Sequence, residues 1–269
     1  MGAFGRTTLL AIITLISCNL TFATHANASA WNREQGRILI ITRADDFRSS
    51  STLGLDDGQT IFQRRDVSTY VEYGLSRKFM IGGKVIYGTS NAVAPDTLPT
   101  NASGFSEVEL FSQYQLWRRN SDVGGLRLGV IRPADETSGA RQLVSGDGID
   151  LDLSALYGRN LPFPIGTAFV SSEFGYRLRT GAGADQLRSN ITFGANFTKN
   201  WLFLLDIQSS RALSEAELGS PDFDVVRLQP SLVWRTGKRF SLQAGGFSEV
   251  AGRNLARGRS FFISLWTEF

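Results

Sequence analysis

The sequence has almost none of the residues that build reactive or metal-binding sites. It contains one cysteine, Cys18, and one histidine, His25, and both lie in the first 30 residues. Removal of those residues would leave a chain that can form no disulfide, no Cys/His metal site and no catalytic triad with a histidine base. Neighbouring carboxylates such as Asp150 and Asp152 are explained more simply as a polar wall than as an acid/base pair. We therefore expect a protein without enzymatic activity, cofactor or metal.

A long apolar run of the kind that forms a membrane-spanning helix is also missing. Beyond the first 30 residues, a notable apolar run covers only residues 201–205, whereas a spanning helix needs about 20 apolar residues. Any membrane span must therefore be a β-strand. The composition, 20% charged and 42% hydrophobic, permits this, because lipid-facing and lumen-facing residues alternate and their hydropathies average out. The formal charge of +3 is spread along the chain, so no nucleic-acid partner is expected.

The first 30 residues have the pattern of a secretory signal peptide. Arg6 supplies the positive charge, residues 9–16 form an apolar core, and small residues offer cleavage sites at 26–28 or 28–30. We predict that residues 1–30 are a cleaved signal peptide and that residues 31–269 form the mature domain, starting at Trp31. As an alternative, residues 15–18 resemble the lipobox of bacterial lipoproteins, which would make Cys18 the lipidated first residue.

The last nine residues form an alternating strand. Its apolar face carries Phe261, Ile263, Leu265 and Phe269. In an open sheet this strand would be an exposed edge, but in a closed barrel it pairs with the first strand. These four residues resemble the β-signal of bacterial outer-membrane proteins, and the resemblance implies the barrel-assembly machinery as a partner. The alternative is the last strand of a β-sandwich.

Alternating stretches of about ten residues recur from Arg37 to the end, separated by turns that are alternately short and long. The stretches are residues 37–47, 63–75, 79–88, 107–117, 126–131, 149–157, 168–178, 187–197, 201–209, 226–234, 240–246 and 261–269. Residues 89–105, 133–146 and 212–222 are predicted long loops. The sequence thus predicts an all-β fold, a closed antiparallel up-and-down transmembrane β-barrel of about twelve strands with periplasmic short turns.

Aromatic residues on the outward faces lie beside the short turns or the terminus. They are Tyr73, Phe79, Tyr114, Tyr157, Phe197, Trp201, Trp234, Phe240 and Phe269. This arrangement is typical of an aromatic girdle at a membrane interface. We therefore predict a location in the bacterial outer membrane, with membrane lipid as a partner.

Charged residues fall on the strand faces that would point into the barrel. They are Lys84, Glu107, Glu109, Arg127, Asp150, Asp152, Glu173, Arg177, Arg179, Arg188, Asp206, Arg227 and Arg235. Hairpin geometry around a turn at residues 162–166 predicts a network of Asp150, Arg177 and Arg188. Because acidic residues come early and arginines late, we also expect two facing arcs of opposite sign. Such charges can orient solutes in a channel, or pair and fill a narrow lumen, and the sequence leaves both open.

Four short blocks resemble a known channel family. Residues 30–31, 71–75 and 107–111, together with Phe269, resemble the channel family linked to the meta-pathway of phenol degradation. The resemblance implies a passive channel for small compounds, aromatic ones included. We therefore expect a passive channel for small-molecule solutes with a charged lumen. The alternative is a non-conducting barrel that supports the envelope, or that assists export or adhesion through its long loops.

Overall fold

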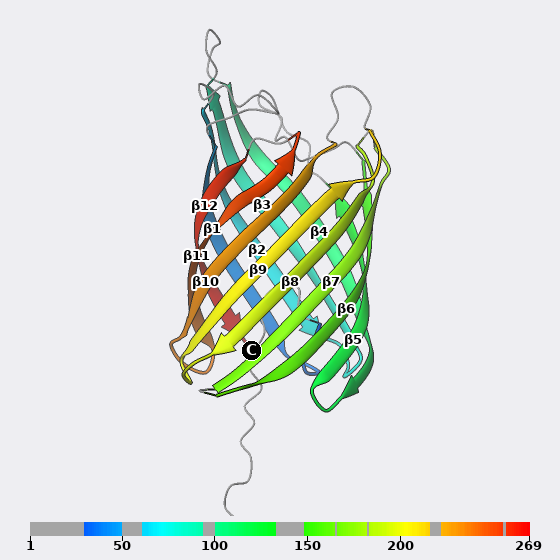
Figure 1. The fold of residues 1–269 in the computed structure, drawn as a ribbon, viewed down its shortest axis with the longest axis vertical. Helices are drawn as coiled ribbons and strands as arrows, with labels where there is room; N and C mark the ends of the chain where they lie inside the picture. The colour runs from blue at the N-terminus through cyan, green and yellow to red at the C-terminus, as the bar shows by residue number, and fades with distance from the viewer. Residues whose placement is uncertain are drawn as a thin grey trace, which may run out of the picture.

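A computed structural model describes residues 30–49, 61–93, 100–132, 148–164, 166–181, 183–215, 222–254 and 257–269. These residues form twelve strands, β1 (Ile38–Ser49), β2 (Ile61–Gly74), β3 (Phe79–Val93), β4 (Thr100–Arg119), β5 (Asp122–Arg132), β6 (Asp150–Phe163), β7 (Gly166–Arg179), β8 (Gln186–Asn196), β9 (Trp201–Ala212), β10 (Asp224–Arg235), β11 (Phe240–Arg253) and β12 (Gly258–Glu268). Each strand pairs with its sequence neighbours, and β1 pairs with β12, so the sheet closes into a barrel (Figure 1). The predicted fold class is confirmed. The signal peptide stays a prediction, because residues 1–29 lie outside the described part of the chain.

The barrel is closed by backbone hydrogen bonds between its first and last strands. The amide of Ile38 donates to the carbonyl of Phe269 at 3.2 Å, and the amide of Phe269 donates to the carbonyl of Ile38 at 3.0 Å. Both termini of the sheet therefore lie at the end that carries the short turns, the lower end in Figure 1. Nowhere in the described ranges is there a helix long and apolar enough to cross a membrane.

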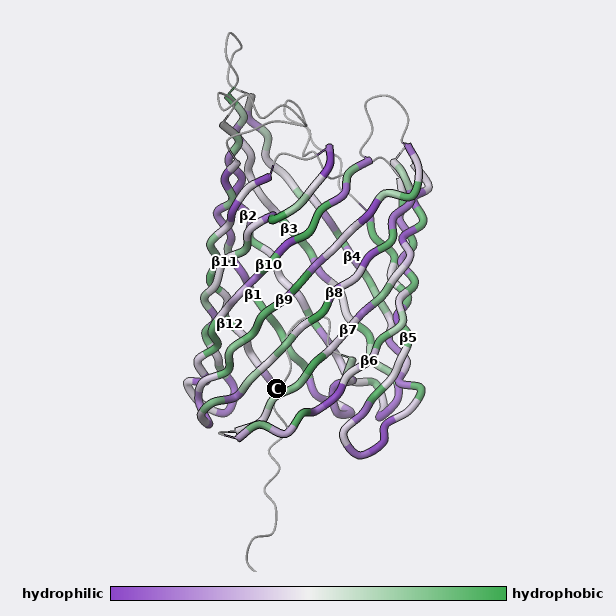
Figure 2. Tube along the Cα trace, in the orientation of Figure 1, coloured by the Kyte–Doolittle hydropathy of each residue, from purple (hydrophilic) through white to green (hydrophobic). Residues whose placement is uncertain are grey.

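Along much of the wall, alternation places polar side chains inside the barrel and apolar ones outside. In β6, for example, Asp152 is 6% exposed while its neighbour Leu153 is 58% exposed. Exposed apolar side chains of this kind occur on most strands, and Figure 2 shows hydrophobic segments along the wall and hydrophilic ones at the hairpin ends. A soluble protein would have the opposite arrangement, whereas a barrel in lipid requires this one.

Several strands are longer than the sequence predicts. The predicted loop at residues 89–105 is wrong, because β3 continues to Val93 and β4 begins at Thr100. Their ladder continues through polar pairs such as Thr89 with Ser103, and polar residues on both faces leave no alternation in hydropathy to detect. The predicted end of β6 at residue 157 is also wrong, since the strand runs through Pro162 to Phe163. The loop predicted at residues 133–146 lies outside the described residues.

Inside the barrel, apolar side chains gather at the short-turn end. The buried cluster comes from the strand ends nearest those turns and from the segment before β1. Its members are Ala30, Trp31, Leu39, Ile41, Val123, Leu156, Phe169, Leu202, Leu204, Val233 and Trp266. The lumen therefore has an apolar part near the short turns and a polar part nearer the long loops.

Candidate functional site

The polar part of the lumen contains a cavity of about 390 Å³ bordered by side chains from most of the strands. Nine charged residues predicted to face the lumen border it, namely Lys84, Glu107, Glu109, Asp150, Arg177, Arg179, Arg188, Asp206 and Arg227. Three more, Arg127, Asp152 and Glu173, border an adjoining cavity of about 250 Å³. Arg235 lies instead at the short-turn end, where its Nη1 donates to the carbonyl of Lys199. The cavity is thus a charged chamber on the long-loop side of the apolar cluster.

The segment before β1 enters the barrel and packs into the apolar cluster. Trp31 is 7% exposed, and its ring meets Phe169 edge to face with the centroids 5.9 Å apart. The amide of Ala30 donates to Ser171 Oγ at 3.1 Å. A Cβ atom at Gly158 would lie only 2.6 Å from the indole ring, so a glycine is needed where Trp31 rests on the wall.

Polar contacts anchor the same segment. Arg33 Nε donates to Glu72 Oε2, and the hydroxyl of Tyr70 donates to the other carboxylate oxygen at 2.7 Å. Burial lowers the pKa of the Arg33 guanidinium, but the adjacent Glu72 carboxylate, together with Glu268 and Tyr70, raises it, and the net shift is upward, so Arg33 stays charged. The side chain of Gln113 donates to Asn32 at 3.0 Å. Residues 30–33 therefore close the short-turn end of the lumen through both apolar and ionic contacts.

Sequence reasoning missed this closure. Residues 31–36 precede the first alternating stretch, so periodicity gives them no place in the barrel. The available signal was Trp31, a large apolar residue outside every strand, followed closely by Arg33. Glu72, which binds Arg33, is one of several polar residues in the alternating stretch 63–75, and nothing in the sequence marks it as a partner of Arg33.

A network of ion pairs on β6, β7 and β8 borders the cavity. Asp152 Oδ2 lies 2.6 Å from Arg188 Nη1 and 3.3 Å from Arg177 Nε. Asp150 Oδ2 lies 3.6 Å from Arg179 Nε and 3.9 Å from Arg177 Nη1. The predicted contact between Asp150 and Arg177 is present, but the register differs by two positions, since Asp152 is directly opposite Arg177. Asp152, which is absent from the predicted network, binds both Arg177 and Arg188.

Each of the further ion pairs contributes at least one side chain to this cavity or to the adjoining one. They are Lys84 with Glu107 (3.0 Å), Arg127 with Glu173 (3.6 Å), Arg227 with Glu249 (2.6 Å), Arg43 with Asp45 (2.6 Å) and Arg64 with Asp66 (2.7 Å). The expectation of two facing arcs of opposite charge is therefore wrong. Buried charges need close partners, and these partners come from the same or nearby strands. The chamber wall thus alternates in charge over short distances.

The structure offers little to a metal ion. Among the described residues, no group of three or more His, Cys, Asp or Glu side chains could hold one. The carboxylates of the lumen are engaged instead by arginines, lysines and hydroxyl groups, as for Asp206, which accepts hydrogen bonds from Thr192 and Gln229.

The outer surface carries the predicted aromatic residues at the short-turn end. Trp201 and Trp234 stack with centroids 5.9 Å apart, and Phe79, Tyr114, Tyr157, Phe197, Phe240 and Phe269 are exposed. The residues of the proposed assembly signal also face outward, with Phe261, Ile263 and Leu265 exposed by 62%, 57% and 42%. Their recognition by the assembly machinery stays a prediction.

Comparison with known proteins gives structural matches only. Searches of protein-family models and of curated proteins find no match to the sequence. The COG4313 outer membrane channel from Pseudomonas putida F1 is similar with a TM-score of 0.72 and 10% identity, covering 91% of this chain and 100% of that one. The KdgM porin has a TM-score of 0.51 and 9% identity, with 85% and 99% covered. The translocator domain of the autotransporter NalP from Neisseria meningitidis has a TM-score of 0.51 and 12% identity, with 88% and 90% covered. The chain therefore has the fold of the bacterial outer-membrane β-barrels, a fold that channels, porins and autotransporter domains share.

Proposed function

We propose that this protein is a passive channel for small polar solutes in the bacterial outer membrane, and that residues 31–33, at the start of the mature chain, hold it closed in the conformation described above. One observation carries the proposal. The charged chamber on the long-loop side is separated from the short-turn end by an apolar closure, and Trp31 of that closure belongs to no strand. Wall residues are fixed by the closed ladder, because leaving it would cost backbone hydrogen bonds. The segment that carries Trp31 is held by side-chain contacts and isolated backbone hydrogen bonds, so it can move at a lower cost than a wall strand.

The wall chemistry favours small solutes that carry charge or strong dipoles. Cations and carboxylates alternate around the cavity at ion-pair distance, so a passing solute can exchange contacts with both signs. Such a wall binds weakly at many points rather than tightly at one, as conduction requires. No chemical step is assigned to these residues, and the proposed role is transport without catalysis.

The proposed location rests on the fold and on the outward faces. An exposed apolar band and an aromatic girdle at the short-turn end suit a bilayer. Delivery there requires an exported precursor, so we keep residues 1–30 as the proposed signal peptide and the terminal strand as the proposed contact for the assembly machinery.

A second candidate is a barrel that does not conduct. It is favoured by the firmness of the closure, since Glu72 is fully buried and bound by both Arg33 and Tyr70. In that case the barrel would serve as an anchor for its long loops in export or adhesion.

Planar-bilayer recordings of the mature chain and of a variant lacking residues 31–34 distinguish the two candidates. A shift in gel mobility on heating first establishes that each protein forms a compact barrel. We expect rare openings for the intact chain and a steady, ion-selective conductance for the deletion variant. A folded deletion variant that stays electrically silent would overturn the channel proposal.

A further inference from the structure

The outer face of the barrel changes abruptly from apolar to polar on β12, β1, β2, β3 and β4. Strand pairing aligns Ile263, Ala44, Val67, Tyr87 and Phe105 in one outward row. All five are apolar or aromatic, and the last two rings pack edge to face. This row ends the apolar band toward the long loops.

Two residues further along every strand, the outward side chains become polar almost without exception. The next row contains Phe261, Asp46, Arg65, Thr89 and Ser103, and the row beyond it contains Arg259, Arg48, Gln63, Asn91 and Asn101. We call the polar members of these two rows the outer polar surface. Neighbouring strands lie about 4.8 Å apart, so the surface extends roughly 19 Å around the barrel.

One end of this surface is cationic. Arg48 and Arg65 both bind the carboxylate of Asp46, at 2.9 and 3.2 Å, and their side chains are 70% and 67% exposed. Arg259 is also exposed and lies directly opposite Arg48 in the ladder. Like charges at directly opposite positions destabilise a sheet unless something neutralises them. These two rows therefore contain three guanidinium groups and one carboxylate, which binds only Arg48 and Arg65, so an excess of positive charge faces outward.

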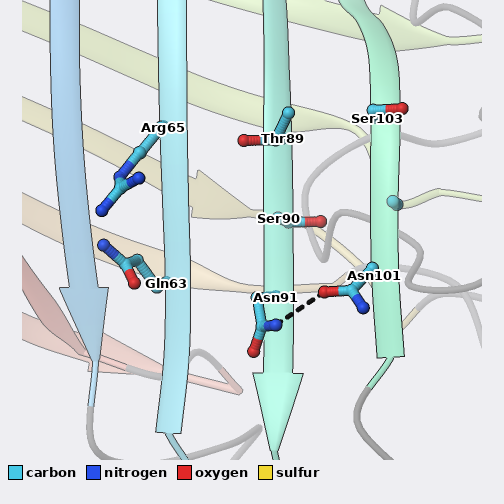
Figure 3. A pocket seen from close by; sticks show the side chains of 8 residues that line it. Gln63, Arg65, Thr89, Ser90, Asn91, Asn101 and Ser103 are labelled. Carbon is cyan, nitrogen blue, oxygen red and sulfur yellow. Dashed lines mark hydrogen bonds between the residues drawn. The ribbon is translucent and has the colours of Figure 1, made fainter.

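The other end offers neutral hydrogen-bonding groups beside a hollow. A cavity of about 540 Å³ is bordered by Gln63, Arg65, Thr89, Ser90, Asn91, Asn101, Ala102 and Ser103. Figure 3 shows these side chains on three adjacent strands, with the hydrogen bond between Asn91 and Asn101. Amide and hydroxyl groups on a concave surface can both donate and accept, which suits the hydroxyl groups of a sugar.

We propose that the outer polar surface binds the phosphorylated saccharide headgroup of an outer-leaflet glycolipid of the lipid A type. The guanidinium groups of Arg48 and Arg259 would take a phosphate, since arginine binds phosphate with paired donors. The amides and hydroxyls toward β4 would take the sugar, while the acyl chains lie on the apolar row below. The inference rests on the proposed outer-membrane location and is independent of whether the lumen conducts.

Native mass spectrometry of the detergent-solubilised barrel, titrated with bisphosphorylated lipid A, tests this assignment. R48Q/R259Q removes the two opposed cations, and N91A/N101A removes the paired amides. R132Q/R211Q is the matched control, because Arg132 and Arg211 are exposed outward arginines on β5 and β9. Heat-shifted gel mobility confirms that each variant is folded.

We expect R48Q/R259Q to weaken lipid A binding about tenfold, R48K/R259K to weaken it less, and the control to match the parent protein. N91A/N101A should weaken lipid A and its dephosphorylated form to the same degree, whereas R48Q/R259Q should affect only the phosphorylated form. Equal loss in R132Q/R211Q, equal binding of phosphatidylglycerol, or displacement by inorganic phosphate alone would overturn the proposal. Bilayer conductance of R48Q/R259Q should be unchanged, so a failed channel and a failed glycolipid site give different results.

Discussion

Trp31 meets Phe169 edge to face inside the barrel, with ring planes at 85°. The contact joins a segment that belongs to no strand to the wall of β7. Replacing Trp31 by alanine should remove about 3 kcal/mol of the stabilisation that comes from burying its side chain. This loss shifts the ratio of the closed to the open conformation of the segment roughly a hundredfold. We expect frequent or permanent conductance in planar bilayers. The matched control is Trp117→Ala, since Trp117 is 46% exposed, and openings in that variant at the same rate would contradict the assignment.

A substitution at Gly158 tests the same closure without changing any residue of the segment that carries Trp31. A Cβ atom there would lie 2.6 Å from the Trp31 ring, so Gly158→Ala should displace the indole ring from its packed position. We expect an open probability between that of the parent protein and that of W31A. Gly237→Ala is the control, because a Cβ at Gly237 meets nothing within 4 Å. Identical recordings for both glycine variants would show that the ring does not depend on this contact.

The ion pair between Arg33 and Glu72 can be tested as a pair. Arg33→Ala leaves a fully buried carboxylate without its cation, which costs about 3–5 kcal/mol. The cost should appear as an open lumen, as a lower free energy of unfolding in urea, or as both. Glu72→Gln removes the charge that needs the cation, so the double variant should recover much of the loss. Additive losses in the double variant would mean that the two side chains act independently.

Arg188 and Arg177 share Asp152 but differ in exposure, which separates conduction from stability. The side chain of Arg188 is 40% exposed and that of Arg177 is 11% exposed. In the W31A background, Arg188→Gln should shift the reversal potential in a KCl gradient toward cation preference, with less than about 1 kcal/mol lost in stability. Arg177→Gln should cost about 3 kcal/mol in urea unfolding. An unchanged reversal potential in R188Q would place the ion path elsewhere.

Phe269 tests the proposed assembly signal. Its ring is 49% exposed, as is that of Phe240, so Phe269→Ala and Phe240→Ala remove similar surface from the finished barrel. Refolding into detergent should therefore be equal for both variants. In cells we expect F269A alone to reduce the amount of barrel in the outer membrane severalfold, measured by membrane fractionation. Equal reduction by F240A would assign the effect to lost packing and not to recognition.

Much of the wall could be predicted because alternation depends on local chemistry. The stretch at 149–157 alternates leucine with aspartate and serine, and β6 has the faces it implies. The register of β6 on β7 differs from the predicted one because the hairpin is centred one residue later along the chain, with Phe163 paired to Gly166. Moving the centre of a hairpin by one residue shifts every opposed pair by two positions, which is why Asp152 replaces Asp150 opposite Arg177.

Other features of the structure produce no periodic pattern in the sequence. The ends of β3 and β4 are polar on both faces, so hydropathy could not separate strand from loop there. Arg43 with Asp45 and Arg64 with Asp66 are ion pairs within one strand face, and the predicted set of lumen charges contains none of these four residues. The position of Trp31 depends on contacts with Phe169 and Gly158, which are distant in sequence.

The pairing of β1 with β12 also determines the order of events during folding. It joins residues such as Asp45 and Ser260, 215 positions apart, so its ladder cannot form until the last strand has been delivered. The segment that carries Trp31 leads directly into β1 and ends up inside the wall that this ladder completes. We therefore expect completion of the barrel and enclosure of the segment to be coupled late steps of folding, so that in the proposed channel the closure would form together with the wall.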